Sequence, residues 1–207
     1  MKGERIIDMR KDLPGDFYSI TSFTDKLLEY LAMRSSKENH DPFFAYLPFT
    51  APHWPLQAPR EVVMKYRGVY DDGPEALTQR RLHRLIELGL IPAGVEHAPS
   101  QGVLGKEWVD MTKDKRAISA HKMEVFAAMV DLINQNFGRV VEYLSRTGEL
   151  DNTFILFISD NGAEEAALEA LSIMGGLKTR GGIIEKYYDN CLVYIGKPTS
   201  FVWYSAR

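Results

Sequence analysis

The sequence predicts an α/β fold in which helices flank a parallel-rich sheet. Thr153–Ile158 is apolar without polar alternation, which is typical of a strand buried on both faces. Residues 113–146 before it predict a long amphipathic helix. Phe43–Leu47, a second apolar run between two prolines, is interpreted as another buried strand. Strand, long helix and strand in this order form a βαβ crossover, which is normally right-handed.

The long helix is predicted from the spacing of its apolar residues. They recur at alternating intervals of four and three, and Gly148 is expected to end the helix. This predicted apolar stripe consists of Phe126, Val130, Ile133, Phe137, Val140 and Leu144.

Shorter helices are predicted from caps and helix-breaking residues. Thr21 or Ser22 is expected to cap a helix that extends to about Met33. Between the first strand and the long helix, four prolines from 48 to 59 indicate a stiff loop. Residues 60–67 predict a short helix ended by Gly68, and residues 75–88 predict another ended by Gly89. We expect residues 60–110 to be an insertion or an elaborate connection.

Composition limits the classes of protein to which the chain can belong. Its 207 residues are 45% hydrophobic and carry a net charge of -3, which is an ordinary globular balance without the basic excess that favours nucleic acid or anionic membranes. Cys191 is the single cysteine, so an intramolecular disulfide is excluded. Met1–Arg10 has no apolar core of a secretory signal, so we expect a cytoplasmic protein.

Candidate chemistry follows the two predicted strands, because ligands of open parallel sheets bind beyond the carboxyl ends of the strands. Asp160 and Asn161 offer hard oxygen ligands for Ca²⁺ or Mg²⁺, and Gly162 lets the backbone turn. Asp-Asn-Gly is also common in plain turns. His53, in the loop after the first strand, could donate to an anion or a leaving group, or could simply pack against the proline loop.

Two motifs resemble a known family. The stretch Pro42–Pro59, which contains Pro-His-Trp-Pro-Leu, is similar to the middle of bacterial-type arylsulfatases of the alkaline phosphatase superfamily. So is the helix over Met123–Leu144 followed by Asn152–Gly162, which ends in Ser-Asp-Asn-Gly. The motifs are specific when they occur together in this order, and the resemblance covers most of the chain.

The resemblance implies hydrolysis of a sulfate ester to an alcohol or phenol and sulfate. In this family a formylglycine is the nucleophile and Ca²⁺ stabilises charge on the sulfate. By motif, Asp160 and Asn161 match two metal ligands, and His53 matches a histidine that binds sulfate. The implied partner is a small-molecule sulfate ester, with no nucleic acid or membrane partner.

Several family features do not occur in the sequence. It has no Cys-x-Pro-x-Arg motif, no early Asp-Asp pair and no early Lys-x-His segment, and Asn134 stands where relatives carry aspartate. We therefore expect residues 1–207 to form part of a sulfatase catalytic domain, inactive alone, with the formylglycine in a missing N-terminal part. Two alternatives stay open: a phosphodiester or phosphonate hydrolase of the same superfamily, and a non-catalytic remnant.

Overall fold

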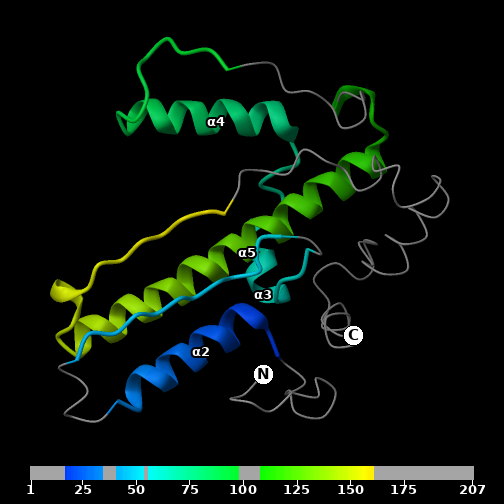
Figure 1. Cartoon of the computed structure of the whole chain (residues 1–207). Coiled ribbons are helices and arrows are strands. Elements are labelled where there is room, and N and C mark those ends of the chain that lie inside the picture. The colour runs from blue at the N-terminus through cyan, green and yellow to red at the C-terminus, as the bar shows by residue number, and fades with distance from the viewer. Residues whose placement is uncertain (1–16, 35–40, 54–55, 98–107, 161–207) are drawn as a thin grey trace, which may run out of the picture.

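A computed structural model describes residues 17–34, 41–53, 56–97 and 108–160. These ranges contain four α-helices and three short 3₁₀ turns, and no β-strand occurs within them (Figure 1). The α-helices are α2 (Ser19–Ala32), α3 (Arg60–Val63), α4 (Gly73–Glu87) and α5 (Lys113–Arg146). The 3₁₀ turns are η2 (Met64–Tyr66), η4 (Trp108–Asp110) and η5 (Leu150–Asn152).

The longest element is α5, and its predicted bounds are confirmed. The Thr112 side chain caps its first turn by accepting a hydrogen bond from the Lys115 N–H at 3.4 Å. The helix ends before Gly148, whose φ of +74° is a left-handed conformation that glycine adopts without strain. Local sequence signals therefore set both ends of α5.

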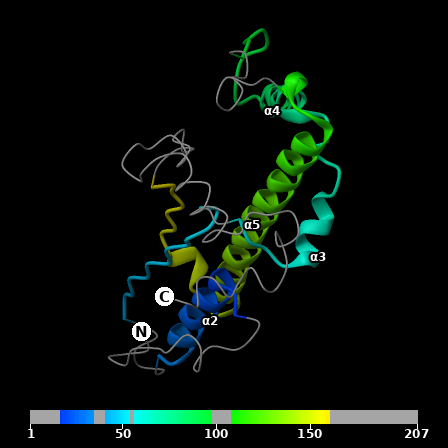
Figure 2. The same cartoon turned by 90° about the vertical axis from the view of Figure 1, so that its right-hand side faces the viewer.

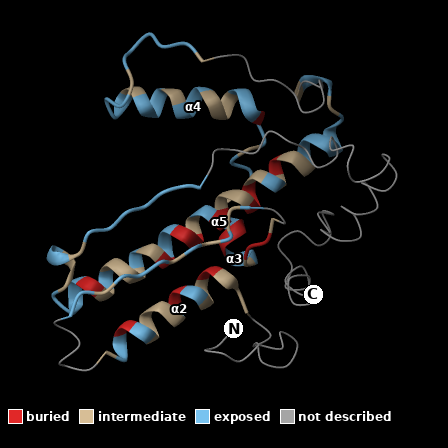
Figure 3. Cartoon of the chain, viewed as in Figure 1, coloured by how far each residue is buried: buried red, intermediate tan, exposed pale blue. Residues whose placement is uncertain are grey.

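The core forms where α2 and α3 pack against α5 (Figure 3). Its buried residues are Ile20, Ala58, Val62, Val63, Val125, Ala128, Met129, Leu132 and Ile133. The predicted apolar stripe of α5 is therefore confirmed only in part: Ile133 and Leu144 are buried and the other members are intermediate, except Val130, which is 43% exposed. The buried stripe is shifted by one residue toward the N-terminus relative to the predicted stripe, which rotates it by about 100° about the helix axis. It includes Ala128, which has no exposed surface.

The start of α2 also differs from the prediction. The helix begins at Ser19, ahead of the predicted cap at Thr21 or Ser22, and its N-cap residue Tyr18 makes no side-chain capping bond. Tertiary contacts hold this end instead. The hydroxyl of Tyr18 donates to the Gln57 carbonyl at 2.9 Å, and Ile20 is buried in the core. Burial therefore determined where the helix starts.

The two predicted strands are extended backbone, but neither is a buried strand. Residues 41–53 and 153–160 run in the same direction along α5, away from its C-terminal end (Figures 1 and 2). Among the described residues no backbone ladder joins them, and Phe44 and Phe154 are 94% and 89% exposed. A strand needs neighbouring strands and a layer on each face to be buried, and the described residues supply only helices beside these segments.

Helix α4 lies apart from the core (Figure 1). The two shorter helices predicted in this region are confirmed: α3 with η2 precedes Gly68, and α4 ends before Gly89. The Trp108 ring lies against Gly73, where an added Cβ would come within 2.6 Å of the ring. No helix in the described ranges is both long enough and apolar enough to cross a membrane.

Candidate functional site

His53 lies at the end of the first extended segment, after a tight turn. Its backbone N–H donates to the Thr50 carbonyl at 3.2 Å, and the Ala51–Pro52 peptide bond is cis. Ala51 packs against the core, whereas His53 is exposed. The loop is therefore attached to the core just before the histidine, which is exposed.

Asp160 is the last described residue of the second extended segment and is exposed. Asn161, the other predicted metal ligand, lies outside the described residues. The segment that leads to Asp160 is held against α5 by Phe157, whose ring makes an edge contact with Phe137 at 5.6 Å between centroids and 60° between planes. One aromatic contact therefore attaches this segment to the helix close to its candidate ligand.

The structure brings the two predicted site segments to the same side of α5, running in the same direction (Figure 2). In the described part of the chain, no three His, Cys, Asp or Glu side chains are grouped closely enough to hold a metal ion. Ca²⁺ takes six to eight oxygen ligands. The chemistry of Asp160 fits calcium, but most of the ligands would have to come from outside the described residues.

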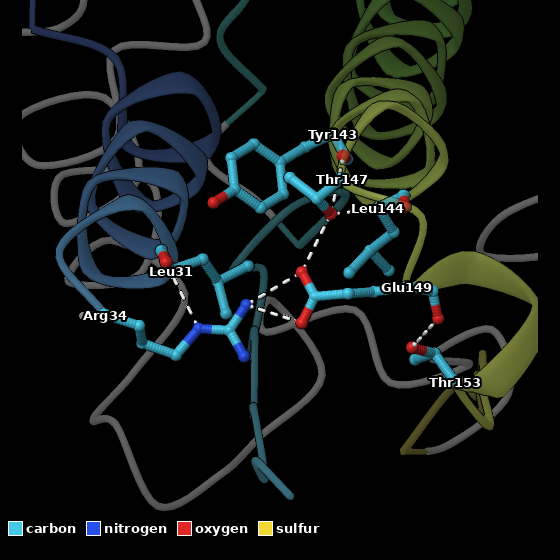
Figure 4. Close-up of polar contacts among 7 residues, drawn as sticks. All are labelled: Leu31, Arg34, Tyr143, Leu144, Thr147, Glu149 and Thr153. Atoms are coloured by element: carbon cyan, nitrogen blue, oxygen red, sulfur yellow. Dashed lines mark hydrogen bonds and ion pairs between the residues drawn. The ribbon is translucent and has the colours of Figure 1, made fainter. Parts of the chain in front are cut away.

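Sequence reasoning missed an ion pair that joins the ends of two helices (Figure 4). Nη2 of Arg34, after α2, donates to both carboxylate oxygens of Glu149, after α5, at 2.8 and 2.9 Å. Both side chains are partly buried, and Thr147 Oγ1 donates to the same carboxylate at 2.7 Å. The Thr147 hydrogen bond has the largest effect on the pKa of Glu149 and lowers it. The hydrogen bond and charge of Arg34 lower it further. The residues are far apart in sequence, so no local pattern predicted the pair.

A second polar cluster lies in the helical core. Glu124 on α5 is buried, accepts a hydrogen bond from the Gly68 N–H at 2.8 Å, and lies 2.7 Å from Nδ1 of His121. The carboxylate thus ties the turn after η2 to α5. A sequence signal was present, because Glu124 interrupts the apolar stripe next to Val125.

Comparison with known proteins shows similarity over nearly the whole chain. The family model described as Sulfatase matches residues 2–189. An uncharacterized sulfatase of Schizosaccharomyces pombe is 48% identical over 93% of this chain, and an arylsulfatase of Klebsiella aerogenes is 33% identical over 98% of it. A multifunctional alkaline phosphatase superfamily protein of Trinickia caryophylli is 28% identical over 76% of it.

The chain is much shorter than these relatives. It spans 33% of the Schizosaccharomyces pombe protein, 40% of the Klebsiella aerogenes protein and 30% of the Trinickia caryophylli protein. The similarity therefore concerns one part of each of these proteins.

Proposed function

We propose that this chain, which belongs to the sulfatase family, forms part of an enzyme that hydrolyses aryl sulfate esters. The observation that carries the proposal is the family match over residues 2–189. The aryl substrate is supported by 33% identity to an arylsulfatase over 98% of the chain. The substrate would be a small-molecule sulfate ester, and the products would be a phenol and sulfate.

The family match implies an alkaline-phosphatase-like α/β domain. We propose that residues 43–47 and 153–158 are parallel strands of its sheet. Their common direction along α5 and the high exposure of their apolar side chains support this assignment (Figure 3). Strands of such a sheet are covered on both faces, so these side chains would be buried by neighbouring strands and by a second helical layer.

In this proposal Asp160 and Asn161 supply oxygen ligands to Ca²⁺. A carboxylate and an amide carbonyl are the hard donors that calcium prefers, and Asp160 is exposed at the end of its segment. When bound, the ion would act as a Lewis acid that stabilises negative charge on the sulfate oxygens. Most of its remaining ligands would come from parts of the protein outside the described residues.

His53 would bind the sulfate group or donate a proton to the leaving oxygen. An imidazole changes its protonation near neutral pH, so it can supply either a hydrogen bond or a proton. The turn that holds the backbone N–H of His53 fixes the backbone from which the side chain extends, and the residue is exposed. The nucleophile would lie elsewhere, because the sequence contains no Cys-x-Pro-x-Arg motif.

A second candidate is a phosphodiester or phosphonate hydrolase of the same superfamily. The 28% identity to a multifunctional alkaline phosphatase superfamily protein supports it. The two reactions differ in the transferred group, so direct competition between a sulfate ester and a phosphodiester in one assay separates them.

A chimera tests the function of this chain. The chain replaces the aligned part of Klebsiella aerogenes arylsulfatase, and hydrolysis of an aryl sulfate is measured with calcium and with a chelator. We expect calcium-dependent turnover, lost in the Asp160→Ala chimera and lowered by on the order of a hundredfold in the His53→Ala chimera, the usual scale for a positioned proton donor. The unmodified 207-residue chain should show no turnover.

Two outcomes would contradict the proposal. One is a folded chimera that hydrolyses a phosphodiester but not the aryl sulfate. The other is turnover and calcium content that do not change when Asp160 and His53 are replaced. Because the chimera can fail to fold, the same substitutions are also made at the aligned positions of the intact Klebsiella enzyme, and calcium is measured by atomic absorption.

A further inference from the structure

Arg34 makes three different contacts at the point where both extended segments begin. Nη2 bonds to the Glu149 carboxylate, Nε donates to the Leu31 carbonyl at 3.1 Å, and the guanidinium carbon lies 4.7 Å from the centroid of the Phe43 ring. The Arg34 side chain is only 15% exposed, and that of Glu149 is 20% exposed. These contacts are therefore partly shielded from water, and partial burial makes ion pairs and cation–π contacts stronger than they are on the open surface.

Each contact leads to a different segment. Phe43 begins the first extended segment, and the Glu149 carbonyl accepts a hydrogen bond from Thr153 Oγ1, which begins the second, at 2.7 Å. The Leu31 contact fixes the guanidinium on the end of α2 (Figure 4). One side chain therefore ties together the end of α2 and the near ends of both segments.

We propose that Arg34 is a positioning residue, which sets the register of the two segments whose far ends carry His53 and Asp160. This inference rests on the proposed function, because the site at those far ends is part of that proposal. Extended backbone rises about 3.3 Å per residue, so a slip of one residue at the near end would move the far end by the same distance. Metal–ligand distances are held within about 0.2 Å, so such a slip would break the site.

Lysine should not replace Arg34 in this role. An ammonium could pair with Glu149, but it lacks the planar guanidinium, which reaches the carboxylate, the Leu31 carbonyl and the Phe43 ring at once. The surface pair Lys26–Glu29 on α2 provides a matched control, because it is exposed and joins residues of the same helix.

The register is measured by electron–electron resonance between spin labels. Tyr46 and Leu156, which are 77% and 67% exposed, are replaced with labelled cysteines in a Cys191→Ser chain of full length. We expect one narrow distance distribution. In Arg34→Lys and Arg34→Met it should broaden or shift by at least one residue's rise, about 3.3 Å, while Lys26→Met leaves it unchanged.

Circular dichroism is recorded on the same samples, so that a loss of helix is distinguished from a local slip. If Arg34→Met does not fold, Arg34→Lys and Glu149→Gln decide the result. A distribution that stays unchanged in folded Arg34 variants would overturn the proposal, and so would an equal change in Lys26→Met.

A second readout separates this inference from the proposed function. In the arylsulfatase chimera, Arg34→Lys should lower kcat by about a hundredfold or more, because a misplacement of about 1 Å can already cost that much, and change KM little. An inactive chimera with Arg34 intact would count against the proposed function only, and the spin-label distances would still decide the register. An active chimera whose kcat does not change in Arg34→Lys would refute the positioning role.

Discussion

The two stripes of α5 that contact other parts of the molecule are covered to very different degrees. Along the stripe that packs on α2 and α3, Val125 and Ala128 have no exposed surface. Along the neighbouring stripe, which faces the extended segments, Val130 is 43% exposed and Phe157 of the second segment is 66% exposed. Among the described residues, the first stripe forms a closed core, whereas the second contacts the second segment through Phe137 and Phe157 and leaves apolar surface open.

The difference shows that one amphipathic helix can carry two apolar stripes with different partners. Burial of apolar surface contributes roughly 25 cal/mol per Å², so the closed stripe supplies most of the stability of the described part. The open stripe carries the segments of the proposed site. We therefore expect stability and function to depend on different residues of the same helix.

The largest effect is expected in the closed core. Met129 is 4% exposed, so Met129→Ala should lower the free energy of unfolding by about 2–5 kcal/mol. Val130→Ala, the next residue and half-exposed, is the matched control and should cost under about 1 kcal/mol because its methyl groups already contact water. Urea unfolding measures both, and equal losses would show that the two stripes do not differ.

The next effect concerns the buried carboxylate of the core. Glu124→Ala would leave the Gly68 N–H without its acceptor, and we expect a loss of about 1–3 kcal/mol. Glu124→Gln keeps an acceptor oxygen and should lose less, while exposed Glu142→Ala on the same helix should change little. Thermal and urea unfolding provide the measurement, and a neutral Glu124→Ala would mean that the turn does not depend on this bond.

A smaller effect is expected on the open stripe. The edge contact between Phe137 and Phe157 should contribute about 0.5–1.5 kcal/mol beyond the area that the rings bury. A double-mutant cycle with Phe137→Leu and Phe157→Leu isolates this coupling energy. A coupling energy indistinguishable from zero would mean that the second segment is not attached to α5 at this point.

The smallest effect on stability is expected at acidic pH. It concerns the ion pair between Arg34 and Glu149, which joins the end of α2 to the end of α5. The folded state lowers the pKa of Glu149 below its ordinary value of 4.5 through the Thr147 hydrogen bond and the Arg34 charge. Its contribution to stability is therefore present above pH 4.5 and is lost as the pH falls through the lower folded value. The free energy of unfolding, measured from pH 7 to pH 3, should fall less steeply with pH in Glu149→Gln than in the wild type. Parallel curves for the two proteins would contradict this prediction.

Sequence alone predicted the helical elements and their ends best. Helix α5 has the predicted bounds and ends before Gly148, and α4 ends before Gly89 as expected, because left-handed glycines act within a single turn of chain. The sulfatase family was also identified from sequence, since its two motifs are local patterns of residues. The roles assigned to His53, Asp160 and Asn161 remain predictions.

Tertiary structure decided the rest, because burial depends on residues that are distant in sequence. It chose the stripe one residue out of phase with the predicted one, since α2 and α3 cover that side of α5. Within the described residues, 43–47 and 153–158 are extended but pair with no other strand, because a strand is completed only by its neighbours. Tertiary structure also brought Arg34 to Glu149, a pair that no local spacing could predict and that links both segments of the proposed site.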